Sequence, residues 1–394
     1  MTHTARIIRK AGIATATLFI LWTLWYKVND ADFWWHLTAG QVMLSDGWIQ
    51  TDPFAHTREG LPYLATHGWL SEVILALLWS IGGSTGVILL RISLALTALL
   101  SLLLIDTRRV WPNALLVMLS TVLMRSVWQD RPQMWTYTLF ALTLILVIEF
   151  ANSPNERENN RTKNLYKYGA LLVLIQWLWS NLHGGASLIM LAPVGALFIQ
   201  SLLDKRGEAK MIFMVMLGMG IAFFLTPNGI HNLRYVSYLF TDQTAQFIQE
   251  WRPPSLRKYL LQLGPLWFIT IAVLRSGRHQ RLFSWLLLIT FGVLAGTAVR
   301  HIPLFILTAT ALIIWQLKHN EHWQSLLTQT ESEPQKCIAL SLLAATVPIL
   351  IFLPTSKVLQ NAEMVGLGTH EPYATAYEFV ETSGLTGNMF NTYD

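Results

Sequence analysis

The stretch Asp30-Ala31-Asp32-Phe33-Trp34-Trp35-His36 begins where the first hydrophobic segment of the chain, residues 11–28, ends. That segment closes with Trp22, Trp25 and Tyr26, and such aromatic residues gather at the boundary between a membrane and water. The two aspartates are therefore predicted to lie at the surface of a bilayer. A carboxylate there is either in water or held for chemistry, because burying it in hydrocarbon is costly.

The composition defines the class of protein. Hydrophobic residues make up 53% of the 394 residues and charged residues only 13%, which predicts an all-α polytopic membrane protein with the lipid bilayer as a partner. The single cysteine, Cys337, excludes a disulfide framework and a cysteine-based zinc site. No basic patch interleaved with aromatic residues accompanies the net charge of +5, so we expect no nucleic-acid partner.

Eleven apolar segments predict about 11 transmembrane helices, since about 20 residues are needed to cross the hydrocarbon. The segments are 11–28, 84–105, 113–127, 132–151, 168–181, 186–203, 211–226, 260–274, 283–298, 302–317 and 337–353. Residues 1–353 would then form one transmembrane domain whose first outer loop covers residues 29–83. Residues 354–394 read as the start of an extracytoplasmic domain, apparently incomplete.

The charged residues predict the orientation of the chain. Most of the 28 basic residues fall on the side of the N-terminus, which the positive-inside rule assigns to the cytoplasm. Most of the 23 acidic residues, Asp130 among them, fall on the opposite side. We therefore expect an inner-membrane protein with an uncleaved first span, its C-terminus periplasmic or extracellular and its working face on the outside.

The first outer loop is long enough to hold structure of its own. Apolar periodicity predicts two amphipathic helices, at 31–44 and 70–81, lying flat on the membrane, the second ended by Gly82-Gly83. In the first of these, Asp32 and His36 project from one face because they are four residues apart. Asp30 and Asp32 also have a structural interpretation, as the N-cap and a first-turn charge of that helix.

Polar residues recur at the outer ends of successive predicted spans. They are Arg131, Gln133, Asn181, His183, Asn228, Glu250, Trp251, Arg252, Arg300 and His301, and the first outer loop adds His36, His67 and Glu72. Each alone is consistent with a turn, a snorkelling anchor or a satisfied loop histidine. Together they predict an outer vestibule that binds a substrate.

The residue types in this set suit one kind of chemistry. A carboxylate of Asp30 or Asp32 can take the proton of an acceptor, while arginines hold the phosphate of a lipid-linked donor and stabilise it as it leaves. Asp30 and Asp32 could also bind Mg²⁺ or Mn²⁺ together with a nearby imidazole or glutamate.

An ordered set of short motifs runs along the chain. It comprises Asp30–His36, Thr51-Asp52-Pro53-Phe54, His67-Gly68-Trp69-Leu70-Ser71-Glu72, Arg131-Pro132-Gln133, Asn181-Leu182-His183-Gly184-Gly185, Pro227-Asn228-Gly229, Glu250-Trp251-Arg252-Pro253-Pro254 and Phe390-Asn391-Thr392-Tyr393-Asp394. This order resembles a group of bacterial membrane proteins that are similar to the GT-C superfamily of polyprenyl-phosphate-dependent glycosyltransferases.

The resemblance implies the inverting transfer of a sugar from a polyprenyl phosphate or diphosphate donor to a glycan, lipid or protein acceptor on the outer side. It implies an acid of the first outer loop as the general base, at Asp30 or Asp32. We favour Asp30, with Asp32 supporting it or binding a metal. Gly68 stands where the related motif carries an acid.

Two other functions remain open at this point. A transporter or lipid-handling protein would need charged or strongly polar groups deep in several spans. The polar residues within the predicted spans are mainly Thr and Ser, and Arg91 and Gln176 are the exceptions. A non-catalytic partner in envelope polysaccharide assembly could keep the fold and lack transfer.

Overall fold

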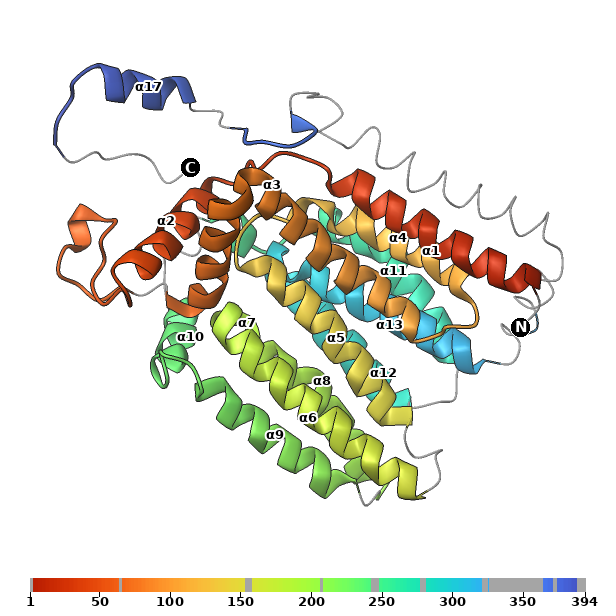
Figure 1. Cartoon of the computed structure of the whole chain (residues 1–394). Coiled ribbons are helices and arrows are strands. Elements are labelled where there is room, and N and C mark those ends of the chain that lie inside the picture. The colour runs from red at the N-terminus through yellow and green to blue at the C-terminus, as the bar shows by residue number, and fades with distance from the viewer. Residues whose placement is uncertain are drawn as a thin grey trace.

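The computed structural model describes residues 3–63, 66–152, 158–205, 208–241, 248–276, 281–320, 325, 364–370 and 374–387. Its described part is built from helices joined by short 3-10 turns (Figure 1). The helices are α1 (His3–Leu24), α2 (Ala31–Ser45), α3 (Trp69–Ser101), α4 (Val110–Met124), α5 (Gln133–Asn152), α6 (Glu158–Leu182), α7 (Gly184–Ser187), α8 (Leu191–Leu203), α9 (Ala209–Phe224), α10 (His231–Thr241), α11 (Leu256–Ser276), α12 (Arg281–Thr297), α13 (Ile302–His319) and α17 (Ala374–Thr382).

Several of these helices can cross a membrane by length and apolar composition. The described residues contain six such segments: Thr66–Leu104, Val110–Val127, Gln133–Asn152, Gly184–Leu203, Leu256–Ser276 and Val299–His319. Two shorter apolar helices, Ala209–Phe224 and Leu282–Thr297, coincide with two more predicted spans. The all-α polytopic class is confirmed. The count of about 11 stays a prediction, because the segments 11–28 and 168–181 fall in α1 and α6, which are not among these spans, and 337–353 lies outside the described residues.

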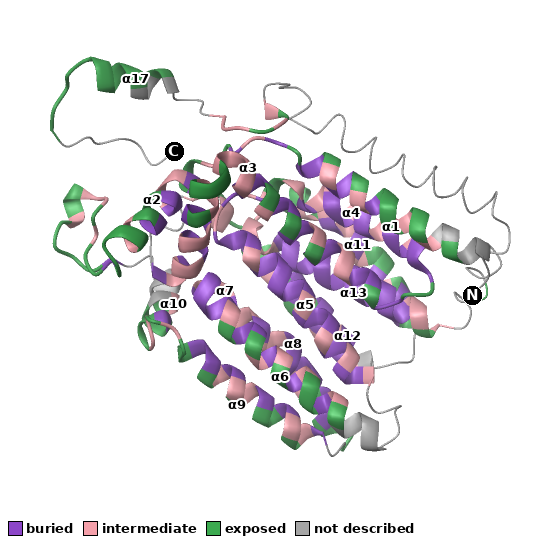
Figure 2. Ribbon diagram, in the orientation of Figure 1, coloured by how far each residue is buried: buried purple, intermediate pink, exposed green. Residues whose placement is uncertain are grey.

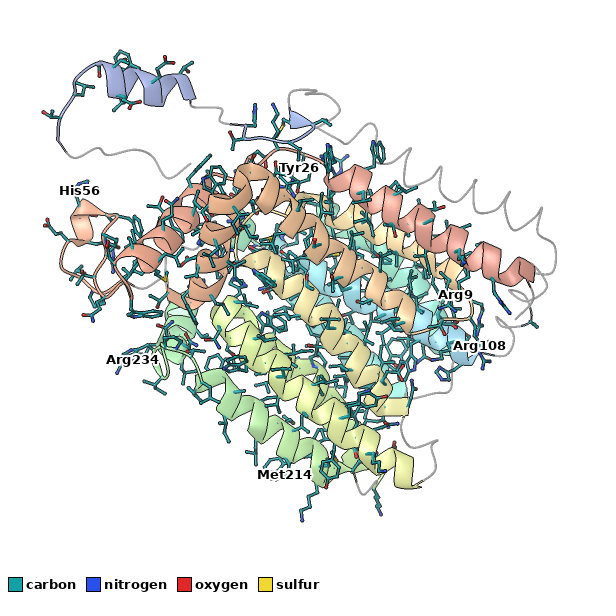
Figure 3. The ribbon with its side chains drawn as sticks, viewed as in Figure 1. Arg9, Tyr26, His56, Arg108, Met214 and Arg234 are labelled. Atoms are coloured by element: carbon teal, nitrogen blue, oxygen red, sulfur yellow. The ribbon has the colours of Figure 1, made fainter. Side chains whose placement is uncertain are left out.

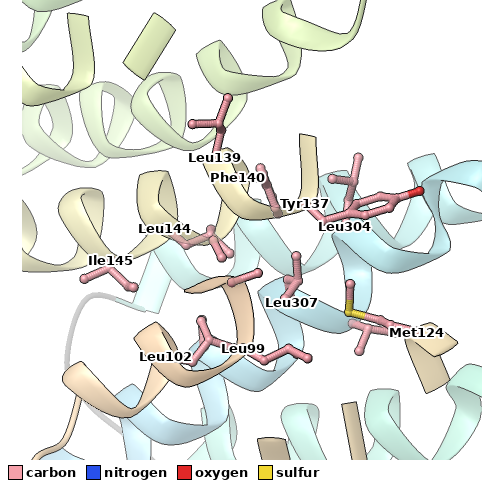
Figure 4. Close-up of a cluster of buried hydrophobic side chains, with 14 of the residues drawn as sticks. Leu99, Leu102, Met124, Tyr137, Leu139, Phe140, Leu144, Ile145, Leu304 and Leu307 are labelled. Atoms are coloured by element: carbon pink, nitrogen blue, oxygen red, sulfur yellow. The ribbon is translucent and has the colours of Figure 1, made fainter. Parts of the chain in front are cut away.

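The core of the bundle lies between α5 and α13, which are buried along most of their length (Figure 2). Figure 4 shows Phe140 and Leu144 of α5 in one apolar cluster with Leu304 and Leu307 of α13. Both helices are apolar on nearly every face, which is the pattern of a helix surrounded by other helices. Pro303 occupies the first turn of α13, where its missing amide proton is not needed.

Two glycines set the path of the chain through the first outer loop. A Cβ at Gly40 would lie 2.0 Å from the carbonyl oxygen of Glu72, so only glycine lets α2 pack this closely against α3. Gly83 has a positive φ of 55° and breaks α3 into two helices that run in different directions in Figure 1. The second predicted amphipathic helix therefore does not end at Gly82-Gly83, because α3 continues past this pair with a kink.

The two ends of the bundle carry different parts of the sequence. Figure 3 shows Arg9 and Arg108 at one end and His56 and Arg234 at the opposite end, which we call the outer end. Residues 364–370 pair with the segment after α1 through isolated bridges, Tyr26 with Val365 and Val28 with Thr369. Residues 364–370 therefore lie beside the segment that leads into the first outer loop. A separate domain at 354–394 stays a prediction. Which end faces the cytoplasm stays a prediction.

Candidate active site

Asp30 lies at the outer end, between the extended segment after α1 and the start of α2. Its backbone is extended (φ −85°, ψ 124°), and its Oδ1 accepts a hydrogen bond of 3.2 Å from the Asp32 amide. This is the geometry of an N-cap, and Asp32 stands in the first turn, where the helix dipole favours a negative charge. The structural interpretation of the pair, Asp30 as N-cap and Asp32 as a first-turn charge, is therefore confirmed. The cap uses only Oδ1 of Asp30 and leaves Oδ2 for another contact.

Arg131 gathers three carboxylates around one guanidinium group. Its Nε lies 3.2 Å from Asp30 Oδ2, its Nη2 donates to Glu250 Oε2 at 2.8 Å, and its Nη1 donates to Asp32. The side chains of Asp30 and Arg131 are only 8% and 12% exposed, whereas that of Asp32 is 58% exposed. Asp30 is therefore the enclosed carboxylate of the pair, and Asp32 is the open one.

The enclosure of Asp30 changes its acidity. Burial raises the pKa of its carboxyl group to about 6 although the charge of Arg131 acts in the opposite direction, and the negative charge of Asp32 adds to the rise. A base works best when its pKa lies near the operating pH, because it is then ionised and still accepts a proton readily. The surroundings of Asp30 give its carboxyl group this property.

A second guanidinium group reaches the same cluster from the turn before α13. Arg300 Nη1 lies 3.8 Å from Glu250 Oε1, and its guanidinium carbon stands 4.0 Å above the centre of the Trp251 ring. The Val299 amide donates to the Arg252 carbonyl at 3.1 Å and so joins the two turns that carry these groups. Glu250 thus lies between two arginines, which together form a place where an anion can bind.

Three predicted site histidines make their contacts with other residues; His36 and His183 are buried and His67 is half-buried. His36 Nδ1 is 2.8 Å from Glu72 Oε1, and this contact joins α2 to α3. The rings of His67 and His183 have centroids 5.6 Å apart, and the Thr136 hydroxyl is 2.6 Å from His183 Nδ1. These contacts join the first outer loop to α5 and to the residue after α6.

The other predicted site residues make local contacts. Gln133 donates to the Tyr137 hydroxyl at 2.5 Å, and Asn181 accepts from Trp69 Nε1 at 3.1 Å. Asn228 accepts from the Thr66 hydroxyl at 2.8 Å, His301 Nδ1 lies 3.2 Å from the Leu294 carbonyl, and the side chain of Arg252 is exposed. None of these contacts places the side chain on Asp30 or Arg131.

The sequence did not predict a buried ion pair, Arg91 with Asp130, beside the site. Arg91 donates to Asp130 Oδ2 at 2.5 Å and to the carbonyls of Leu24 and Tyr26, and its guanidinium stacks over the Tyr26 ring at 3.8 Å. Arg91 and Asp130 are fully buried, and Asp130 directly precedes Arg131. An arginine in an apolar span needs such a partner, so its occurrence there was the available signal.

The carboxylates of the site are engaged with arginine rather than arranged as metal ligands. Among the residues that the structure describes, no group of three or more His, Cys, Asp or Glu side chains could hold a metal ion. The guanidinium of Arg131 contacts both Asp30 and Asp32, in the position that Mg²⁺ or Mn²⁺ would need. We therefore assign no step of the chemistry to a metal, and the metal site stays a prediction.

Taken together, the fold and the cluster define a polytopic membrane protein with an enclosed acid and two arginines at one end of its bundle. The structure is similar to AglB from Archaeoglobus fulgidus, an archaeal oligosaccharyltransferase in complex with an inhibitory peptide and a dolichol-phosphate, with a TM-score of 0.71 and 12% identity over 97% of this chain and 58% of that one. It is also similar to ArnT from Cupriavidus metallidurans bound to undecaprenyl phosphate, with a TM-score of 0.53 and 14% identity over 91% of this chain and 73% of that one.

These neighbours have the GT-C fold, and the resemblance predicted from the motifs is confirmed at the level of fold. The chain spans 58% of the length of AglB. No family model matches the sequence, and no curated protein matches it.

Proposed function

We propose that this protein is a membrane glycosyltransferase that moves a sugar from a polyprenyl phosphate or diphosphate donor to an acceptor on the outer side of the membrane, with inversion. The acceptor is a glycan, a lipid or a protein. The observation that carries the proposal is the enclosed Asp30 held against Arg131, with Arg300 reaching the same cluster through Glu250. The fold shared with AglB and ArnT supports it, because these proteins were solved with dolichol-phosphate and undecaprenyl phosphate.

The two arginines give the donor phosphate a place to bind. Arg131 already contacts three carboxylates, and its contact with the exposed Asp32 is the one most easily exchanged for a phosphate oxygen. Guanidinium groups suit this task because they bind phosphate through two parallel hydrogen bonds. In this proposal, Asp32 and Glu250 hold the arginines in position until the donor arrives.

The transfer step then follows from the positions of acid and arginine. The acceptor oxygen forms a bond to the anomeric carbon while the bond from that carbon to the phosphate oxygen breaks. The acceptor proton passes to Asp30, and the electron pair of the broken bond goes to the phosphate, whose growing charge Arg131 and Arg300 stabilise. Attack from the face opposite the phosphate inverts the anomeric configuration.

The test uses the full chain in nanodiscs. Polyprenyl-phosphate hexoses and pentoses are offered with envelope glycans, lipids or peptides as acceptors, and the transfer rate is measured. Asp30→Asn should lower kcat by about 10²–10⁴-fold, the usual contribution of a general base. Asp46→Asn is the matched control, because Asp46 is an exposed acid in the same loop.

A wild-type rate in Asp30→Asn would contradict the assignment of Asp30 as the base, and wild-type rates in both Asp30→Asn and Asp32→Asn would contradict the proposed mechanism as a whole. A protein that binds the donor and transfers no sugar to any acceptor class would instead favour a non-catalytic role in envelope assembly.

A further inference from the structure

A cavity of about 570 Å³ lies at the outer end of the bundle, apart from the Asp30 cluster. Its walls come from the chain after α2, from the later part of the first outer loop, from the connection between α9 and α10 and from α10 itself. Asp30 caps the start of α2, whereas Trp48, Ile49 and Gln50 of the cavity follow its other end. None of the residues that line the cavity belongs to the Asp30 cluster.

The walls of this cavity are held in place without a ligand. Tyr63 and Ile49 belong to a small apolar cluster of the first outer loop, packed against Trp35 and Phe54. The Tyr63 amide donates to the Gln50 carbonyl at 3.0 Å, which closes the loop as a hairpin. Because these walls are already ordered, a ligand that binds between them loses little binding free energy to the ordering of loops and side chains.

The wall formed by α10 and the segment before it is joined to the first outer loop by direct hydrogen bonds. The Thr66 hydroxyl donates to Asn228 Oδ1 at 2.8 Å, and the Asn228 amide donates to Asn232 on α10 at 3.1 Å. The positions of the loop and of α10 are therefore coupled. The hydrogen bonds of the Thr66 hydroxyl and the two asparagine amides therefore hold the two sides of the cavity at a fixed distance.

The side chains that line the cavity suit a carbohydrate, and one of them, Arg234, can bind an anionic group. Trp48, 39% exposed, and Tyr63 supply aromatic faces, and Gln50 and Asn228 supply amides that suit hydroxyl groups. His231 and Arg234 stand at the same cavity, and the described residues that line it include no carboxylate. Nor does any ion pair within the described part of the chain join Arg234 to an acid. Figure 3 shows Arg234 at the outer end.

We infer that this cavity binds an oligosaccharide that carries a carboxylate, with a uronic acid unit against Arg234 and a neighbouring sugar on Trp48. This inference rests on the proposed function, because it assigns the cavity to the far end of an extended acceptor glycan. An acceptor of several sugar units would lie along α2, with one end in the cavity and its reacting hydroxyl at Asp30. The cavity would then select acidic glycans at a distance from the reacting bond.

The test measures binding alone, so it is independent of transfer. The full chain in phosphatidylcholine nanodiscs is titrated with a trisaccharide that contains glucuronate and with its carboxyl-reduced form, and each Kd is measured by microscale thermophoresis. We expect saturable binding of the acidic form, weakened at least about tenfold for the reduced form and in Arg234→Gln, as befits the loss of a charge-assisted hydrogen bond. Arg234→Lys should recover part of the affinity. Arg257→Gln removes an exposed arginine elsewhere, on α11, and should leave the Kd unchanged.

Three results would overturn the inference: no binding of the acidic form, equal binding of the reduced form, or equal effects of Arg234→Gln and Arg257→Gln. Loss of binding when phosphatidylglycerol replaces phosphatidylcholine would also overturn it, because the cavity would then belong to lipid headgroups. A failure here leaves the transfer test at Asp30 unaffected, and an inactive protein that still binds the acidic form would contradict only the proposed function.

Discussion

The pH dependence of transfer should report the enclosure of Asp30. A general base is active when ionised, so kcat/KM should fall as the pH drops through its pKa in the free enzyme. With a pKa of about 6, about a tenth of the Asp30 carboxyl groups are ionised at pH 5, and kcat/KM there should be about a tenth of its plateau value. An ordinary, solvated aspartate would be almost fully ionised at the same pH.

The assay is kcat/KM from pH 4 to 8 in nanodiscs at limiting donor. A polyprenyl-phosphate sugar is a phosphodiester without a second ionisation in this range, so the acid limb belongs to the protein. Arg131→Gln removes the charge that opposes the rise, so its limb should move to higher pH, whatever its effect on the plateau. Asp46→Asn should leave the limb in place. A limb at the ordinary pKa of aspartate, or none at all, would refute the assignment of Asp30.

Three further predictions concern the support of the site. Arg91→Met leaves the buried Asp130 without its partner and should lower the free energy of unfolding by about 3–5 kcal/mol. Adding Asp130→Asn should recover part of this loss. Thermal and denaturant unfolding in nanodiscs measures both variants. Gly40→Ala should cost about 1–3 kcal/mol because its Cβ meets a carbonyl oxygen of α3, whereas Gly195→Ala, into open space, should cost nothing. Mn²⁺ should bind more tightly to Arg131→Gln than to wild type in electron paramagnetic resonance titrations, because the guanidinium competes for the same carboxylates. Equal stabilities or equal Mn²⁺ affinities would contradict these three accounts.

Much of the fold follows from the apolar segments, because a membrane span must be both long and apolar. The sequence could not show how close α2 comes to α3, since that approach depends on the missing Cβ of Gly40 meeting a particular carbonyl group. The kink at Gly83 was visible as a glycine pair, but its effect, two helices running in different directions, depends on the packing of both halves.

The candidate site was predictable in part, for a physical reason. Asp30, Arg131 and Arg300 are polar residues that flank apolar spans, so the sequence could place them all at one end of the bundle. It could not show that Arg131 would contact both aspartates while His183 pairs with Thr136 instead, because those contacts depend on helix rotation. The cavity at Arg234 is lined by the first outer loop, by the connection between α9 and α10 and by α10 itself, and of its residues the motifs include only Pro227 and Asn228.

The position of a bound donor tests the central claim most directly. In a structure of the full chain with a polyprenyl-phosphate sugar, we expect the phosphate within hydrogen-bond distance of Arg131 and Arg300 and the anomeric carbon turned toward Asp30 Oδ2. A donor phosphate bound away from both arginines, with Asp30 still closed against Arg131, would contradict the account.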